Sequence, residues 1–148
     1  MKKIKKILLS IFLPVVMILT AGILSFASIT EIAHALSGTG GGFFVGSNTT
    51  LNFNATISGS SATNGGGVYV SNGGTFNMNG GSISGNTATV GGGVYVANGG
   101  TFNMFGGSIS GNKATNNGDS IYNNGTFIMT GGTLGETNGV AWVYCDRN

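Results

Sequence analysis

Residues 65–90 read GGGVYVSNGGTFNMNGGSISGNTATV, and residues 91–116 read GGGVYVANGGTFNMFGGSISGNKATN. The two stretches agree at most positions with an offset of 26 residues, which is the signature of a repeat architecture. Degenerate copies begin at Gly40, with GGGFFVGSNTTLNFNATISGS, and at Gly118, with GDSIYNNGTFIMTGGTLGETN. Four copies are present once slips of one or two residues are allowed in the turns, and residues 140–145 are a candidate start of a fifth.

Short alternating segments lie between glycine-asparagine turns in each copy, at residues 68–70, 75–78 and 82–84 of the second one. Alternation of apolar and polar residues predicts strands, and three strands per repeat predict a coil that closes on itself. We therefore expect an all-β fold, a right-handed parallel β-helix of about four coils of 25–26 residues each.

Stacked coils of this kind place like residues on like residues, about 4.8 Å apart. Four inward columns are expected: Phe43/Val68/Val94/Ile121, Leu51/Phe76/Phe102/Phe127, Phe53/Met78/Met104/Met129 and Ile57/Ile83/Ile109/Leu134. Asn86 and Asn112 are candidates for an inward asparagine ladder, with Ala88 and Ala114 facing inward two residues later. Replacement of the inward Phe76 by alanine should be costly, whereas replacement of the outward Asn77 should be nearly neutral. The glycine triplets are interpreted as turns with positive φ.

Charge and composition divide the chain at residue 35. Four of its six basic residues lie in the first six positions, and the formal net charge of the whole chain is +2. Glycine, asparagine, threonine and serine make up more than half of residues 36–148, which excludes a helical domain. Lys113 and Arg147 are the only basic residues there, so a phosphate-binding stripe for nucleic acid is also excluded.

Residues 1–35 have the form of a bacterial signal peptide. Lysines at positions 2, 3, 5 and 6 precede an apolar run over residues 7–27, and Ala33-His34-Ala35 offers a small-x-small cleavage site. The run is also long enough for an uncleaved membrane anchor, so that reading stays open. Either way, we expect residues 36–148 to form a β-helix domain outside the cell or on its surface, touching the membrane only through an uncleaved leader. Cys145 is the only cysteine, so the domain has no intramolecular disulfide.

The repeat resembles those of two groups of proteins. Gly66-Gly67-Val68-Tyr69 and Phe76-Asn77-Met78-Asn79 are similar to the paired GG-aliphatic and F-x-x-N repeats of polymorphic outer-membrane proteins, and to adhesin-like β-helix repeats. The resemblance covers residues 40–135 and implies surface exposure. Phe105 and Thr130 depart from the F-x-x-N asparagine, and Leu51 departs from its phenylalanine.

Catalytic and cofactor-binding patterns are not found, and we expect neither enzymatic activity nor a cofactor or metal. Residues 36–148 contain no histidine, which excludes a Ser-His-Asp triad and a histidine metal site. Asp119 and Asp146 could lie one coil apart as a carboxylate pair, but they are better interpreted as solvated turn residues. No Lys-Ser/Thr follows the glycine triplets, so they are not phosphate loops. Cys145 is interpreted as a residue of a terminal strand.

Two outward surfaces remain as candidates for binding. One is an aromatic column that can stack on sugars or a protein partner, or whose rings simply stack on each other; it consists of Phe44, Tyr69, Tyr95 and Tyr122. The other is a polar lattice, which an ordinary solvated strand face also explains; it consists of Ser58, Ser82, Ser84, Ser108 and Ser110 with Thr56 and Thr133.

These observations predict a surface-exposed or secreted β-helix module with a structural or adhesive role. Its repeated outward residues would offer many weak contacts whose avidity grows with copy number. Candidate partners are glycans, extracellular matrix or other cell-surface proteins. The alternatives are a carbohydrate-active β-helix that binds or cleaves polysaccharide, and an ice- or surface-binding lattice.

Overall fold

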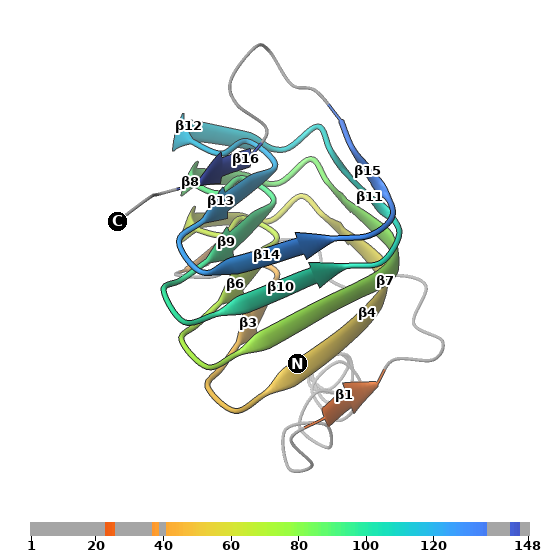
Figure 1. The fold of residues 1–148 in the computed structure, drawn as a ribbon. Helices are drawn as coiled ribbons and strands as arrows, with labels where there is room; N and C mark the ends of the chain where they lie inside the picture. Colours follow the sequence, from red (N-terminus) through yellow and green to blue (C-terminus); the bar gives the residue numbers. More distant parts are fainter. Residues whose placement is uncertain (1–22, 26–36, 39–40, 136–142, 146–148) are drawn as a thin grey trace, which may run out of the picture.

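The computed structural model describes residues 23–25, 37–38, 41–135 and 143–145, and these form a parallel β-solenoid of about four turns (Figure 1). Every strand pair in the described residues is parallel. The chain winds in a right-handed sense through three sheets in turn. The predicted all-β parallel β-helix is confirmed.

Three sheets, here called A, B and C, form the sides of the solenoid. Sheet A consists of β1 (Ile23–Ser25), β4 (Thr50–Ser58), β7 (Thr75–Ser84), β10 (Thr101–Met104), β11 (Ser108–Ser110), β14 (Thr126–Met129) and β15 (Thr133–Leu134). Sheet B consists of β2 (Ser37–Gly38), β5 (Ser61–Asn64), β8 (Thr87–Val90) and β12 (Lys113–Asn117). Sheet C consists of β3 (Phe43–Val45), β6 (Val68–Val70), β9 (Val94–Val96), β13 (Ile121–Asn123) and β16 (Val143–Cys145).

The register between coils confirms all four predicted inward columns. Phe102 pairs with Phe76 on one side and with Phe127 on the other, for example, and the Val, Met and Ile columns align in the same way. The Phe76 and Phe102 side chains are fully buried, and their ring centroids lie 4.9 Å apart. The core is thus a set of like-on-like stacks. It is less covered in the last coil, where Met129 is 40% exposed.

The strands are distributed among the sheets differently from the prediction. Residues 75–78 and 82–84 were expected as two strands, but they belong to one continuous strand, β7, in sheet A. The equivalent residues of the next two coils do form two strands each, β10 with β11 and β14 with β15. The third side of the solenoid is sheet B, built from segments such as Thr87–Val90, which were not predicted as strands. Thr87–Val90 reads TATV, with one buried alanine, Ala88, in place of a run of large apolar residues, so the alternation signal is weak there.

The predicted leader lies mostly outside the described residues. Its described part is Ile23–Ser25, which forms strand β1 and pairs with Thr50–Asn52 of β4. These three residues are therefore extended. Of the candidate fifth copy, Val143–Cys145 forms β16 and stacks on β13, while residues 140–142 lie outside the described residues.

The predicted asparagine ladder is present and fully buried at the turn between sheets A and B. The Asn86 amide accepts a hydrogen bond from the Ser60 backbone N–H (3.0 Å) and donates to the Ile57 carbonyl (3.2 Å) and to Asn112 Oδ1 (2.9 Å). Asn112 repeats the pattern, accepting from the Asn86 N–H and donating to the Ile83 carbonyl. The two amides therefore satisfy turn backbone groups and join successive coils.

The glycine triplets owe their composition to two different constraints. Gly65 has φ 65°, a left-handed conformation that favours glycine, as predicted. Gly66 and Gly67 do not share this conformation, so the positive-φ interpretation is wrong for them. A Cβ at Gly66 would overlap the carbonyl oxygen of Gly92 in the next coil, and one at Gly67 would meet the Gly93 carbonyl. These positions are glycine because the coils approach closely.

Phe76→Ala should lower the free energy of unfolding by about 3–5 kcal/mol, because it empties a fully buried position in the ring stack. Nearest-neighbour coupling should spread the loss through the solenoid. Urea unfolding followed by circular dichroism measures this loss.

Asn77→Ala, expected from the sequence to be nearly neutral, should instead lower the free energy of unfolding by about 1 kcal/mol, because the Asn77 amide donates to Asn52 and accepts from Asn103, both at 2.9 Å. Equal losses at Phe76 and Asn77 would contradict the assignment of inward and outward faces.

Asn86→Ala should cost about 3 kcal/mol or more, since each buried group that loses its partner costs roughly 1–3 kcal/mol. The groups affected are the Ser60 N–H, the Ile57 carbonyl and the Asn112 side chain. The matched control is Asn72→Ala at an exposed turn, which should change stability by less than about 0.5 kcal/mol. Thermal and urea unfolding of both variants provide the comparison, and a neutral Asn86→Ala would show that the ladder does not stabilise the turns.

Candidate binding surface

An aromatic column runs along the outer face of sheet C from the first coil to the last described strand. It contains the four predicted rings, from Phe44, Tyr69, Tyr95 and Tyr122, and a fifth from Tyr144. Successive ring centroids are 5.4, 5.0, 5.0 and 5.1 Å apart, and the interplanar angles are 5°, 6°, 6° and 12°. The five rings therefore form one continuous stack, which we call the aromatic column.

The sequence places each ring by strand alternation and register. In β6 the side chains of Val68 and Val70 are fully buried, so the intervening Tyr69 side chain points to the outer face. The same pattern holds in β9, and Tyr69 pairs directly with Tyr95. Parallel strands lie about 4.8 Å apart, which is close to the stacking distance of aromatic rings. The strand spacing itself thus brings the rings into contact.

Stacking determines which part of each ring a partner can reach. The faces of the inner rings are covered by their neighbours, so these rings present their edges outward and are half-buried. Phe44, at the first end of the column, is 62% exposed, and Tyr144, at the other end, is 36% exposed. The surface is thus a narrow strip of ring edges with more open rings at its ends. A ligand can lie along this strip, but it can stack face to face only near the ends.

Sequence reasoning missed the fifth ring. Val143-Tyr144-Cys145 matches Val68-Tyr69-Val70 in its alternation, and this match was the signal that could have placed Tyr144 in the column. Cys145 is exposed at the end of β16, consistent with its interpretation as a residue of a terminal strand.

The predicted polar lattice lies on the outer face of sheet A. Ser82 pairs with Thr56 and Ser108, and Ser84 pairs with Ser58 and Ser110. The Ser82 hydroxyl donates to Thr56 Oγ1 at 3.3 Å. Beside it runs a ladder of amides that was not predicted as a hydrogen-bonded feature, formed by Asn52, Asn77 and Asn103. Much of the hydrogen-bonding capacity of this face is therefore directed between coils.

Asp119 is not the solvated turn residue that was expected. Its side chain is 3% exposed, and its Oδ1 accepts a 2.6 Å hydrogen bond from the Ala114 N–H. The burial could not be read from the sequence because the fourth copy departs from the repeat at this turn. Its suggested partner, Asp146, lies outside the described residues. Within the described part of the chain, no group of three or more His, Cys, Asp or Glu side chains could hold a metal ion.

The described part of the chain contains no helix with the length and apolar character of a membrane span. Compared with known protein families, curated proteins and solved structures, the chain matches none of them.

Proposed function

We propose that this chain is an exported β-solenoid module with a structural and adhesive role, secreted or held on the surface of a bacterial cell. The aromatic column is the observation that carries this proposal. It places five rings in one row on the outside of a regular scaffold, and a contiguous exposed apolar surface of this kind marks interaction sites in proteins.

The column suits a partner that is extended and repetitive. Ring edges recur about every 5 Å along the column, so a polymer lying on it can repeat the same weak contact several times. Tyrosine contributes an apolar ring and a polar hydroxyl, a combination found at recognition surfaces. Glycans and fibrous matrix proteins have this extended, repetitive character, and we propose them as the class of ligand.

The proposed location rests on the amino-terminal sequence. The four lysines within residues 2–6, the apolar run that follows and the Ala33-His34-Ala35 site together have the form of an export signal. The resemblance of the repeats to those of surface proteins points in the same direction. A domain with a single cysteine and few charges is compatible with export because its stability comes from coil stacking and not from disulfides.

The column can be tested by two triple variants. Replacement of Tyr69, Tyr95 and Tyr122 by threonine removes rings and hydroxyls, while replacement of the same three by phenylalanine removes only the hydroxyls. Binding to immobilised glycan and matrix-protein panels should fall sharply in the threonine variant. The phenylalanine variant should retain the ring stack and the thermal stability of the unchanged protein. Its binding then shows whether the rings suffice for ligand binding without the hydroxyls.

The threonine variant also removes at least one ring from every stacked pair in the column. Its free energy of unfolding should therefore fall by about 0.5–1.5 kcal/mol for each pair lost. Circular dichroism must therefore show a β-rich spectrum before its binding is interpreted. A folded threonine variant that binds as well as the unchanged protein would remove the column from the binding site. Loss of fold would assign the rings a structural role.

Export predicts a mature amino terminus at Leu36. Amino-terminal sequencing of material recovered outside the cell should identify this residue, and removal of β1 with the leader should leave β4 as the first strand of sheet A. Recovery of the intact chain from the cytoplasm alone would contradict the proposed location.

A further inference from the structure

Two outward positions that hold asparagine in the preceding coil hold large apolar residues in the last two coils, one in each coil. Residues 75–86 and 101–112 are identical except that Phe105 replaces Asn79. In the following coil, Ile128 occupies the position of Asn103, with which it pairs in register. An otherwise repeated polar surface therefore becomes apolar at one end of sheet A.

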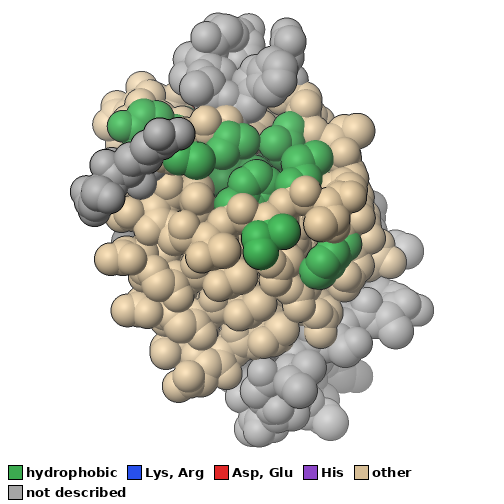
Figure 2. All heavy atoms as spheres, in the orientation of Figure 1, with side chains coloured by type: hydrophobic (Ala, Val, Ile, Leu, Met, Phe, Trp, Pro, Cys, Tyr) green, Lys and Arg blue, Asp and Glu red, His purple; other side chains and the backbone are tan. Residues whose placement is uncertain are grey.

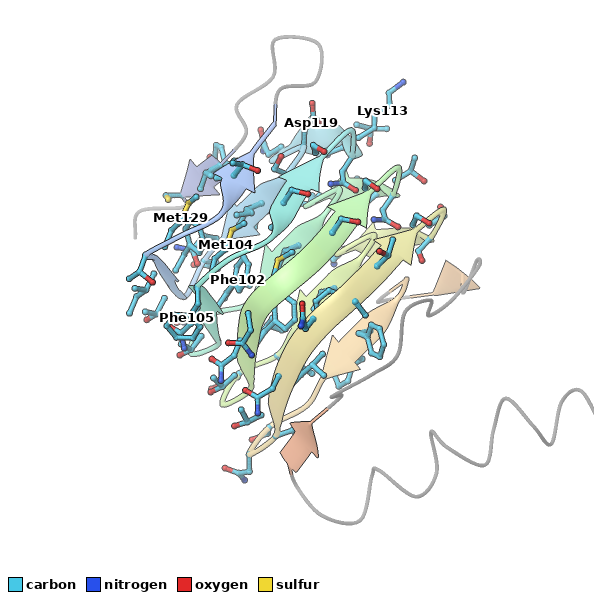
Figure 3. The ribbon with its side chains drawn as sticks, turned by 90° about the vertical axis from the view of Figure 1, so that its right-hand side faces the viewer. Phe102, Met104, Phe105, Lys113, Asp119 and Met129 are labelled. Atoms are coloured by element: carbon cyan, nitrogen blue, oxygen red, sulfur yellow. The ribbon has the colours of Figure 1, made fainter. Side chains whose placement is uncertain are left out.

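These apolar side chains are open to solvent. Phe105 is 51% exposed, Ile128 is 49% exposed, and Met129, next to Ile128 in β14, is 40% exposed. We call these three residues the end patch. Figure 2 shows hydrophobic side chains gathered in the upper half of this face, whereas the lower coils present other side chains and backbone. Figure 3 shows Phe105 and Met129 at the left of the molecule, with Asp119 at the top and Lys113 at the top right.

The end patch adjoins an open strand edge. In sheet A, β14 pairs with β10 and with no other described strand, so its second edge has no ladder partner in the described part of the chain. The inward residue Phe127 of β14 is likewise only partly buried, unlike Phe76 and Phe102 below it. An apolar patch beside an open edge is the usual setting for strand pairing between chains.

We propose that the end patch is a dimer interface, at which a second copy of this chain pairs its own β14 edge with this one about a two-fold axis. A two-fold axis makes the two β14 strands antiparallel, an arrangement that forms a regular hydrogen-bond ladder. It also brings Ile128 and Met129 of β14 against their counterparts and extends the core beyond Phe127, while Phe105 flanks the seam one strand further in. This interface is separate from the aromatic column on sheet C and does not depend on the function proposed for it.

A second copy is favoured over a different partner by the charge of the patch. Phe105, Ile128 and Met129 carry no charge, and the described charged residues Lys113 and Asp119 lie away from them. A charged patch would repel itself across a two-fold axis, whereas an uncharged apolar patch is complementary to itself. The edge also lacks the lysines and prolines with which proteins block pairing of this kind.

The test is the mass of the folded protein over a concentration series, measured by sedimentation and light scattering. The unchanged chain should form a dimer. The double variant Phe105→Asn, Ile128→Asn restores the asparagines found at these positions in the preceding copies. It should weaken dimerisation by about tenfold or more, because a few large side chains carry most of the binding free energy of an interface. Phe44→Asn is the matched control, since it removes a ring that is at least as exposed as Phe105 from the other end of the molecule and should leave the dimer intact.

Amide hydrogen exchange of the unchanged chain provides a readout that needs no variant. Protection of the Thr126–Met129 amides should increase with protein concentration, while that of the Phe43–Val45 amides should not. A monomer at all concentrations, open-ended polymers, a double variant that dimerises normally, or concentration-independent exchange in β14 would each overturn the proposal.

Discussion

The coil-on-coil register is the constraint on which the rest of the structure depends. Each strand pairs in parallel with its counterpart in the next coil, most often 25 or 26 residues away, so residues at matching positions of successive coils lie side by side. Apolar residues must then stack on apolar residues and amides on amides. A slip of one residue would exchange the inner and outer faces of the sheet, so the pattern of the repeat permits only one register.

Much of the fold follows from this constraint and could be predicted from the sequence. The Val, Phe, Met and Ile columns align as expected because near-identical copies can satisfy a parallel ladder in one way. The Asn86–Asn112 ladder was predictable for the same reason, since buried amides at matching positions can bond to each other and to turn carbonyls. The residues that make up each column were thus easier to predict than the assignment of the columns to the three sheets.

The parts that could not be predicted are those in which the repeat pattern is weak or broken. Sheet B has short polar strands in which a single alanine faces inward, so hydrophobic alternation carries little signal there. Asp119 belongs to the most degenerate copy, and its burial depends on a contact with the Ala114 backbone that no spacing rule reveals. The outward side chain of Asn77 looked solvated, but parallel stacking gives it amide partners above and below. In a solenoid, an outward side chain can therefore be hydrogen-bonded to the equivalent side chains of the neighbouring coils.

The same stacking that builds the core also shapes the outer surfaces. On sheet C it joins five rings into a column whose edges, and not faces, meet solvent. On sheet A it joins hydroxyls and amides between coils, and this polar surface ends at Phe105 and Ile128. The functional proposals therefore rest on positions where an aromatic residue recurs in every coil or where an apolar residue interrupts a polar series.

The most direct test of this account is solution NMR of the folded domain, with nuclear Overhauser effects assigned between neighbouring coils. Contacts should connect Tyr69 with Tyr95, Phe76 with Phe102 and the side-chain amide of Asn86 with that of Asn112. Side-chain contacts displaced by one residue along the strands, such as the Tyr69 ring with the methyl groups of Val94 or Val96, would show a different register and would contradict the account of both the core and the surfaces.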